Sequence, residues 1–321
     1  MTKAIVLRTA GGPENLSWED HDPGTPGAGD VRVRQTFAGL NYVDTYLRSG
    51  QYPTELPAVL GREGVGVVET LGDGVAGLNV GDRVAYSSHL GSYAEANIVP
   101  ADRLVPLPDD ITDEAAAAMM LKGMTAQYLV RQTKALGPRD TLLYHAAAGG
   151  VGLIACQWAK HLGATVIGTV GSADKADRAK LHGCDHVIRY DEVDFLDAVM
   201  TLTEGRGVDY VCDAVGVTTI ENSMKAMAHH GVLVSFGAAA GPVPPETWAK
   251  LPPERYLIKG TLPGYTKTRD HLLAAAEDLF AVVRSGAVRI EINQRYVLKD
   301  AAQAHTDLEA RKTTGSTIFV I

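Results

Sequence analysis

Apolar and polar residues alternate at every second position in several short runs of the first 120 residues. The run at residues 30–37 shows this alternation, and the runs at 64–72 and 80–86 are rich in valine and punctuated by glycine. A period of two is that of a half-buried β-strand. Short strands separated by glycine turns predict a compact, barrel-like β domain.

The pattern changes near Asp113. Residues 114–136 are rich in alanine and methionine, and Gly137-Pro138 ends this predicted helix. Short apolar runs then alternate with amphipathic stretches. Strands are expected at 141–145, 165–169, 186–190, 208–213 and 231–236, and helices at 151–162, 173–182, 193–203 and 218–228. This alternation predicts a parallel sheet covered by helices on both faces.

The pattern changes again after residue 262. Helices are expected at 270–285 and 300–311, followed by a last strand at 316–321. The simplest arrangement is a β-rich domain that the nucleotide domain interrupts. We therefore expect one domain from residues 1–124 and 264–321 and a second from residues 125–263.

Composition restricts the function classes. The 321 residues suit two domains, and a formal net charge of −8 argues against nucleic acid as a partner. The amino-terminal residues do not resemble a signal peptide, and no apolar run reaches the roughly 20 residues of a membrane span. We expect a cytoplasmic protein.

The three cysteines, Cys156, Cys184 and Cys212, form no CxxC pair and are expected to be reduced, buried thiols.

A small-residue turn follows the expected strand at 141–145 and leads into the next helix. The pattern is Ala147-x-Gly149-x-x-Gly152, in which alanine replaces the first glycine of the usual fingerprint. Glycine lets the backbone approach a pyrophosphate, and the helix amino terminus offers free N–H groups. The strand–turn–helix context predicts dinucleotide binding at Gly149, Gly150 and Val151.

The second strand of this domain favours NADPH over NADH. Sites for NAD usually carry an acidic residue at its end, whereas residues 166–172 contain none. Lys175 and Arg178 follow on the next helix, and Tyr190 closes the third strand. Cations and hydroxyl groups suit a 2′-phosphate. Asp174 weakens the argument, and a solvated helix face is the alternative for the two cations.

Several segments identify a family resemblance that covers essentially the whole chain. Residues 58–68, 81–84 and 145–152 resemble the medium-chain dehydrogenase/reductase superfamily. Residues 44–50, 121–126, 149–160 and 234–237 resemble its quinone oxidoreductases, the zeta-crystallin-like family. This resemblance implies an α/β protein, with a Rossmann-type doubly wound parallel sheet domain and a GroES-like β-barrel catalytic domain.

Zinc enzymes of the superfamily carry a cysteine and a histidine where this chain has Asn41 and Arg62. No cysteine precedes Cys156, so the structural zinc lobe is missing as well. We therefore expect no metal site. Without zinc to polarise an alcohol, the substrate must already be electrophilic, as a quinone or an activated alkene is.

The resemblance also implies site residues. The catalytic residues would be Asn41, Tyr46 and Tyr52. The residues along NADPH, besides the glycine turn, would be Asn41, Thr125, Gly171, Ser172, Lys175, Tyr190, Val215, Phe236 and Arg311. Structural alternatives exist for several of them. Asn41 could only cap a turn, the tyrosines could be ordinary surface residues, Thr125 could start a helix, and Arg311 could belong to an exposed basic pair. Lys122 could act as an electrostatic donor or form an ion pair.

Three functions fit this pattern. The first is NADPH-dependent reduction of quinones, and the second is reduction of enones or enoyl thioesters with the same cofactor. The third is cofactor binding without significant turnover.

The strand-like residues 256–262 would pair with a second copy in a homodimer, and a covered edge strand in a monomer is the alternative.

Overall fold

In the computed structural model, which describes residues 1–321, the middle of the chain builds a parallel sheet of six strands. The strands are β9 (Thr141–His145), β10 (Thr165–Val170), β11 (His186–Arg189), β12 (Val208–Asp213), β13 (Met227–Ser235) and β14 (Tyr256–Lys259). Their order is β11-β10-β9-β12-β13-β14, and every neighbouring pair is parallel. The order reverses between β9 and β12, because the chain adds β10 and β11 on one side of β9 and then β12, β13 and β14 on the other.

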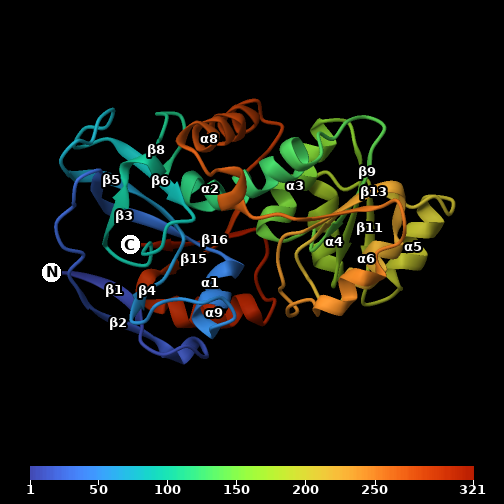
Figure 1. Cartoon of the computed structure of the whole chain (residues 1–321), viewed down its shortest axis with the longest axis horizontal. Coiled ribbons are helices and arrows are strands. Elements are labelled where there is room, and N and C mark those ends of the chain that lie inside the picture. Colours follow the sequence, from blue (N-terminus) through green and yellow to red (C-terminus); the bar gives the residue numbers. More distant parts are fainter. The chain divides into compact units, whose positions relative to one another are not determined.

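Helices connect these strands and flank them in Figure 1. They are α3 (Gly150–His161), α4 (Ala173–Leu181), α5 (Phe195–Leu202) and α6 (Ile220–Lys225). Strand residues such as Leu143, Ile167 and Val211 pack with α5 and α6 in one apolar cluster. Burial on both faces explains why these strands are apolar without strict alternation. The predicted doubly wound parallel sheet is confirmed.

The remaining strands form a β-rich unit. They are β1 (Thr2–Leu7), β2 (Leu16–His21), β3 (Asp30–Leu40), β4 (Ala58–Val59), β5 (Glu63–Leu71), β6 (Arg83–Ser87), β7 (Ala96–Pro100), β8 (Val105–Pro106), β15 (Ile292–Val297) and β16 (Ser316–Val320). A seven-stranded sheet has the order β15-β16-β3-β5-β6-β8, with β7 paired to β3, and a smaller sheet has the order β2-β1-β4. The strands expected at 30–37, 64–72 and 80–86 are thus confirmed as β3, β5 and β6.

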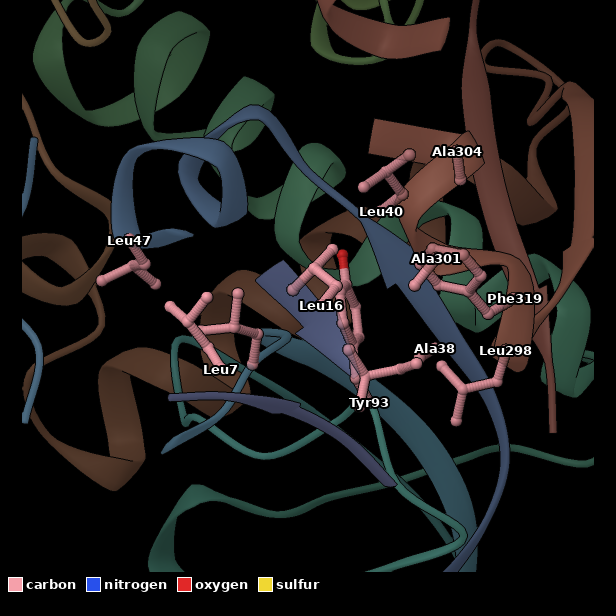
Figure 2. Packing of buried hydrophobic residues seen from close by; sticks show 12 residues of the cluster. Leu7, Leu16, Ala38, Leu40, Leu47, Tyr93, Leu298, Ala301, Ala304 and Phe319 are labelled. Atoms are coloured by element: carbon pink, nitrogen blue, oxygen red, sulfur yellow. The ribbon is translucent and has the colours of Figure 1, made fainter. Parts of the chain in front are cut away.

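The core of the β-rich unit joins the two ends of the chain. Figure 2 shows Leu7 from β1 and Phe319 from β16 in one cluster with Tyr93. The rings of Tyr93 and Phe319 meet edge to face, with centroids 4.9 Å apart. Strand β16 lies between β15 and β3 and pairs Thr317 with Leu40. The C-terminal segment therefore completes the sheet that the first segment begins.

Further helices and turns complete the chain. They are α1 (Tyr42–Ser49), α2 (Asp113–Gln127), α7 (Leu262–Tyr265), α8 (Arg269–Arg284), α9 (Ala301–Glu309), the π-helical turn η3 (Tyr128–Thr133) and the 3-10 turns η1 (Pro13–Asn15), η2 (Ala101–Arg103), η4 (Pro245–Lys250) and η5 (Leu298–Asp300). None of the helices combines the length and the apolar character that crossing a membrane requires.

Two compact units divide the chain. The β-rich unit holds Met1–Met124, Thr266–Phe280 and Ile290–Ile321, and the α/β unit holds Thr125–Tyr265 and Ala281–Arg289. The domain ranges expected from the sequence stay a prediction, and they differ from these units chiefly at residues 281–289. The side-chain amide of Gln157 explains the attachment of this segment. It donates to the carbonyl oxygen of Arg289 at 3.1 Å and accepts from its N–H at 3.0 Å.

Several elements differ from their predicted extent, among them β13, which begins at Met227 and not at residue 231. The helix expected at 114–136 ends as α2 at Gln127 and continues as η3. The helix expected at 218–228 is the short α6, because β13 already pairs with β12 at Met227. The strand-like run at 256–262 stops at Lys259, where β14 ends its pairing with β13. Pairing between strands sets the ends of α6 and β14. The local sequence pattern does not reveal this pairing.

Candidate functional site

The glycine turn after β9 has the geometry of a phosphate cradle. Ala146 has a left-handed backbone with φ of 56°, and Gly149 precedes the first residue of α3. A Cβ atom on Gly152 would lie 2.5 Å from the carbonyl oxygen of Ala146 and 2.7 Å from that of Ala147. Only glycine fits there without a shift of the backbone. No side chain caps α3, so its first N–H groups remain available to a ligand.

A second group of predicted residues meets at the end of β10. A Cβ atom on Gly171 would lie 2.5 Å from the hydroxyl oxygen of Tyr190, so the tyrosine lies directly against this glycine. Ser172 is the N-cap of α4, and its side chain accepts a hydrogen bond from the backbone N–H of Lys175 at 3.4 Å. The structure thus brings Gly171, Ser172, Lys175 and Tyr190 together in one place.

Val215 and Phe236 are joined through Asp213, the last residue of β12. The N–H of Val215 donates to Oδ1 of Asp213 at 2.9 Å, and the N–H of Phe236 donates to its carbonyl oxygen at 3.0 Å. Asp213 is fully buried. Sequence reasoning missed this residue, although an aspartate at the end of an apolar strand is a recognisable signal.

Asn41 stands between β3 and α1 in the β-rich unit. Its backbone N–H donates to Oδ2 of Asp44 at 2.9 Å, as expected of the N-cap position of a helix. Its side-chain Nδ2 donates to Oε2 of Glu63 at 2.8 Å. Asn41 thus occupies the N-cap position of α1, and Glu63 orients its side-chain amide. Its predicted role at the site stays a prediction.

Glu63 is fully buried and was not among the predicted site residues. Besides Asn41, its carboxylate accepts from Nζ of Lys122 at 3.0 Å and from the N–H of Leu121 at 2.7 Å. A Cβ atom on Gly39 would lie 2.0 Å from Oε2 of Glu63, which explains the glycine. Of the two alternatives for Lys122, the structure has the ion pair. A buried pair with three donors is the arrangement in which a buried carboxylate is tolerated.

A second buried acid, Asp44, lies in the first turn of α1. Burial raises the pKa of Asp44 from 3.8 to about 7. Tyr93 donates its hydroxyl to Oδ2 of Asp44 at 3.0 Å and lies 3.3 Å from Nε2 of His305. Burial, with a smaller effect of Arg48, lowers the pKa of His305 to about 3. Oδ1 of Asp44 has no partner. Loss of solvation at this buried position outweighs the hydrogen bonds and the nearby cations, which act in the opposite direction on the pKa of Asp44.

The predicted tyrosines belong to a row of three. The ring centroids of Tyr46 and Tyr52 lie 5.1 Å apart, and those of Tyr46 and Tyr42 lie 5.7 Å apart. Tyr46 is buried, whereas Tyr52 is 41% exposed. Sequence reasoning missed Tyr42, although its spacing of four residues from Tyr46 places both on one helix face.

The remaining predicted cofactor residues are Thr125 and Arg311. Thr125 is buried inside α2, so the alternative that it starts a helix is wrong. Arg311 is exposed and follows α9 with a left-handed backbone at φ of 59°. Its N–H donates to the carbonyl oxygen of Leu308 at 3.0 Å.

Comparison with known proteins identifies the family. Residues 27–109 match the alcohol dehydrogenase GroES-like domain, and residues 150–277 match the zinc-binding dehydrogenase family. A quinone oxidoreductase of Pseudomonas aeruginosa is 48% identical, with both chains covered in full. The chain belongs to the quinone oxidoreductase family of the medium-chain dehydrogenase/reductase superfamily.

Two further members of the superfamily bear on the chemistry. The Escherichia coli quinone oxidoreductase solved with NADPH has a TM-score of 0.96 and 41% identity, covering 99% of this chain and 100% of the other. A 2-haloacrylate reductase of Burkholderia is 38% identical, covering 100% of this chain and 99% of its own. One of the two matching family models is named for zinc binding. This chain has no group of three or more His, Cys, Asp or Glu residues that could hold a metal ion.

Proposed function

We propose that this chain is an enzyme that reduces quinones with NADPH. The observation that carries the proposal is the cradle at Gly149–Gly152, where two backbone carbonyl groups exclude any side chain at position 152. The cradle follows β9 and includes the first residues of α3, beside the point where the strand order reverses. Open α/β sheets bind their ligands at this point. The full-length similarity to quinone oxidoreductases supports the substrate class.

The α/β unit offers the donors that NADPH requires. The N–H groups of Gly150 and Val151 would bind the pyrophosphate, and Gly149, whose own N–H donates to the carbonyl oxygen of Ala146 at 2.9 Å, would let it approach the backbone closely. Lys175, together with Ser172 and Tyr190 beside Gly171, would bind the 2′-phosphate, because a cation and hydroxyl groups match its charge. Thr125, Val215, Phe236, Asn41 and Arg311 complete the proposed cofactor set. When bound, NADPH supplies the hydride that reduces the substrate.

Asn41, Tyr46 and Tyr52 are the proposed catalytic residues. A quinone is electrophilic without a metal, so the protein needs only to orient it and to offer polar contacts to its oxygen atoms. The Asn41 amide is held by Glu63, and the tyrosine row presents ring faces and hydroxyl groups. No step of this proposal requires a metal ion.

A second candidate function is the reduction of an activated alkene. The relative named 2-haloacrylate reductase supports it. Both functions would use NADPH and the same site residues, without a metal ion. They differ only in the acceptor.

Oxidation of NADPH and NADH at 340 nm separates the candidates. We expect turnover with a panel of small quinones and NADPH, and slower turnover with NADH. Turnover with enones or 2-haloacrylates alone would replace the quinone function by the alkene function. Binding of NADPH without turnover on either panel would leave a cofactor-binding protein.

We also propose a homodimer in which β14 pairs with its copy. This strand is the outermost of the parallel sheet, and Tyr256 in it is 55% exposed. An open sheet edge favours pairing with another strand. Light scattering after gel filtration should give twice the mass of one chain, and the variant Tyr256→Arg should shift it toward the monomer. Retention of a dimeric mass in that variant would argue for another interface.

The proposed location is the cytoplasm. All three cysteines are free and buried, which suits a reducing compartment. Fractionation of cells that express the natural protein tests this, and recovery outside the cytoplasmic fraction would contradict it.

A further inference from the structure

A chain of buried hydrogen bonds crosses the point where the strand order reverses. His145, the last residue of β9, lies with Nδ1 2.9 Å from Oγ1 of Thr169 and with Nε2 2.8 Å from Oγ of Ser223. Ser223 donates to Oδ2 of Asp213 at 2.8 Å. All four side chains are buried. The chain links β10, β9, β12 and α6, and Thr169 is the strand partner of His145 in the sheet.

The chemistry of Asp213 sets the direction of every bond in this chain. A carboxylate only accepts, so the hydroxyl hydrogen of Ser223 points to Asp213. The oxygen of Ser223 must then accept from His145, which places the imidazole proton on Nε2. Nδ1 is left as an acceptor for the hydroxyl of Thr169. Burial lowers the pKa of His145, in agreement with a neutral ring that carries one proton.

This direction excludes nucleophilic catalysis by the serine. In a hydrolase triad the serine hydroxyl donates to the histidine, which removes its proton. Here Ser223 accepts from His145 and donates to Asp213, and it is fully buried. The three residue types of a triad therefore serve another purpose in this fold.

The far end of the chain shapes the loop after β12. Oδ1 of Asp213 accepts from the N–H groups of Val215 at 2.9 Å and Gly216 at 3.0 Å. Oδ2 also accepts from the hydroxyl of Thr219 at 2.8 Å. Gly216 has φ of 94°, and a Cβ atom there would lie 2.5 Å from the carbonyl oxygen of Gly241. Asp213 thus holds this loop in a conformation open only to glycine at position 216.

We propose that Thr169, His145 and Ser223 are positioning residues that act through Asp213 to fix the loop at Val215 for NADPH. This inference rests on the proposed function, because Val215 is one of the proposed cofactor residues. The strands β9 and β12 flank the reversal point, where open α/β sheets bind their ligands. A carboxylate that loses one of its donors can reorient and release the N–H groups of the loop.

Cofactor affinity measured by NADPH fluorescence tests the proposal. Ser223→Ala should raise the Kd for NADPH about tenfold, with kcat for a quinone changed less than about twofold. Thr169→Val should weaken binding in the same way, and Thr169→Ser should restore it because the hydroxyl returns. Thr201→Val is the matched control, since its exposed hydroxyl donates to the carbonyl oxygen of Asp197 at 2.9 Å. Thr169→Val carries the test if Ser223→Ala does not fold.

Nitrogen NMR of histidine-labelled, cofactor-free protein gives a second readout. The chain has ten histidines, and His145→Gln assigns the signal. We expect a proton on Nε2 and none on Nδ1. The opposite tautomer, or unchanged NADPH binding in both Ser223→Ala and Thr169→Val, would overturn the inference. Failure of the wild-type chain to bind NADPH would instead refute the proposed function, while the tautomer would still test the direction of the chain.

Discussion

Glu63 holds Asn41 and Lys122 with the same carboxylate oxygen, Oε2, at 2.8 and 3.0 Å. The residue that orients a proposed catalytic amide is therefore also one half of a buried ion pair. Stability and activity depend here on one side chain, so a change of Glu63 should be visible in both.

Glu63→Gln removes this charge and leaves Lys122 buried without its ion-pair partner. Breaking a buried pair costs about 3–5 kcal/mol of unfolding free energy, and we expect a loss of that order in urea unfolding. The value of kcat/KM for a quinone should fall by about tenfold or more, because the Asn41 amide loses its charged acceptor. Glu19→Gln is the control, since it disrupts the exposed pair with Arg8. Equal stability of the two variants would contradict the prediction.

Gly152→Ala should damage the phosphate cradle. Its Cβ atom would press against two backbone carbonyl groups, and overpacking of this kind costs about 1–3 kcal/mol. We expect the Kd for NADPH, measured by fluorescence titration, to rise by about tenfold or more. Gly137→Ala is the matched control, because the nearest atom to a Cβ there is Oδ2 of Asp140 at 4.0 Å. Similar weakening in both variants would mean that the cradle is not the site of binding.

Lys175→Ala should reduce the preference for NADPH over NADH. A hydrogen bond to a charged group contributes about 1.5–3 kcal/mol, which corresponds to a loss of about 10- to 100-fold in kcat/KM for NADPH. The value for NADH should hardly change. Lys180→Ala removes an exposed cation from the same helix and should leave both values intact. An equal loss with both cofactors would assign Lys175 a structural role.

Asp44→Asn should change the pH dependence of stability. The folded state raises the pKa of Asp44 from 3.8 to about 7, so this group contributes its stability fully below pH 4 and loses it as the pH rises toward and beyond 7. The loss amounts to about 4 kcal/mol at most. Asparagine does not ionise. The unfolding free energy of the wild type minus that of the variant should therefore fall between pH 4 and pH 8.

Measuring both proteins across this pH range separates Asp44 from its neighbours. Tyr93, Lys122 and Arg62 interact with it, His305 lies against Tyr93, and all four are present in both proteins. The titration of these neighbours contributes to the unfolding free energy of both proteins and largely cancels when one value is subtracted from the other. A difference that is flat with pH would show that Asp44 ionises normally.

Local sequence patterns predicted those parts of the molecule that depend on neighbouring residues. The turn from Ala147 to Gly152 could be recognised because its strand, glycines and helix are contiguous. The N-cap Asn41 was found because it occupies the place of a zinc ligand in a known motif. The partnership of Asn41 with Glu63, and that of His145 with Ser223, could not be predicted. These contacts join residues 22 and 78 positions apart, and only the paired strands bring them together.

The position of β16 affects the order in which the chain can fold during synthesis. All six strands of the parallel sheet lie within residues 141–259, so that sheet can close while later residues are still being added. The seven-stranded sheet needs residues 316–320 between β15 and β3. Until they leave the ribosome, the edge of β3 that β16 will cover is exposed to other chains. The segment made first therefore belongs to the sheet that is completed last.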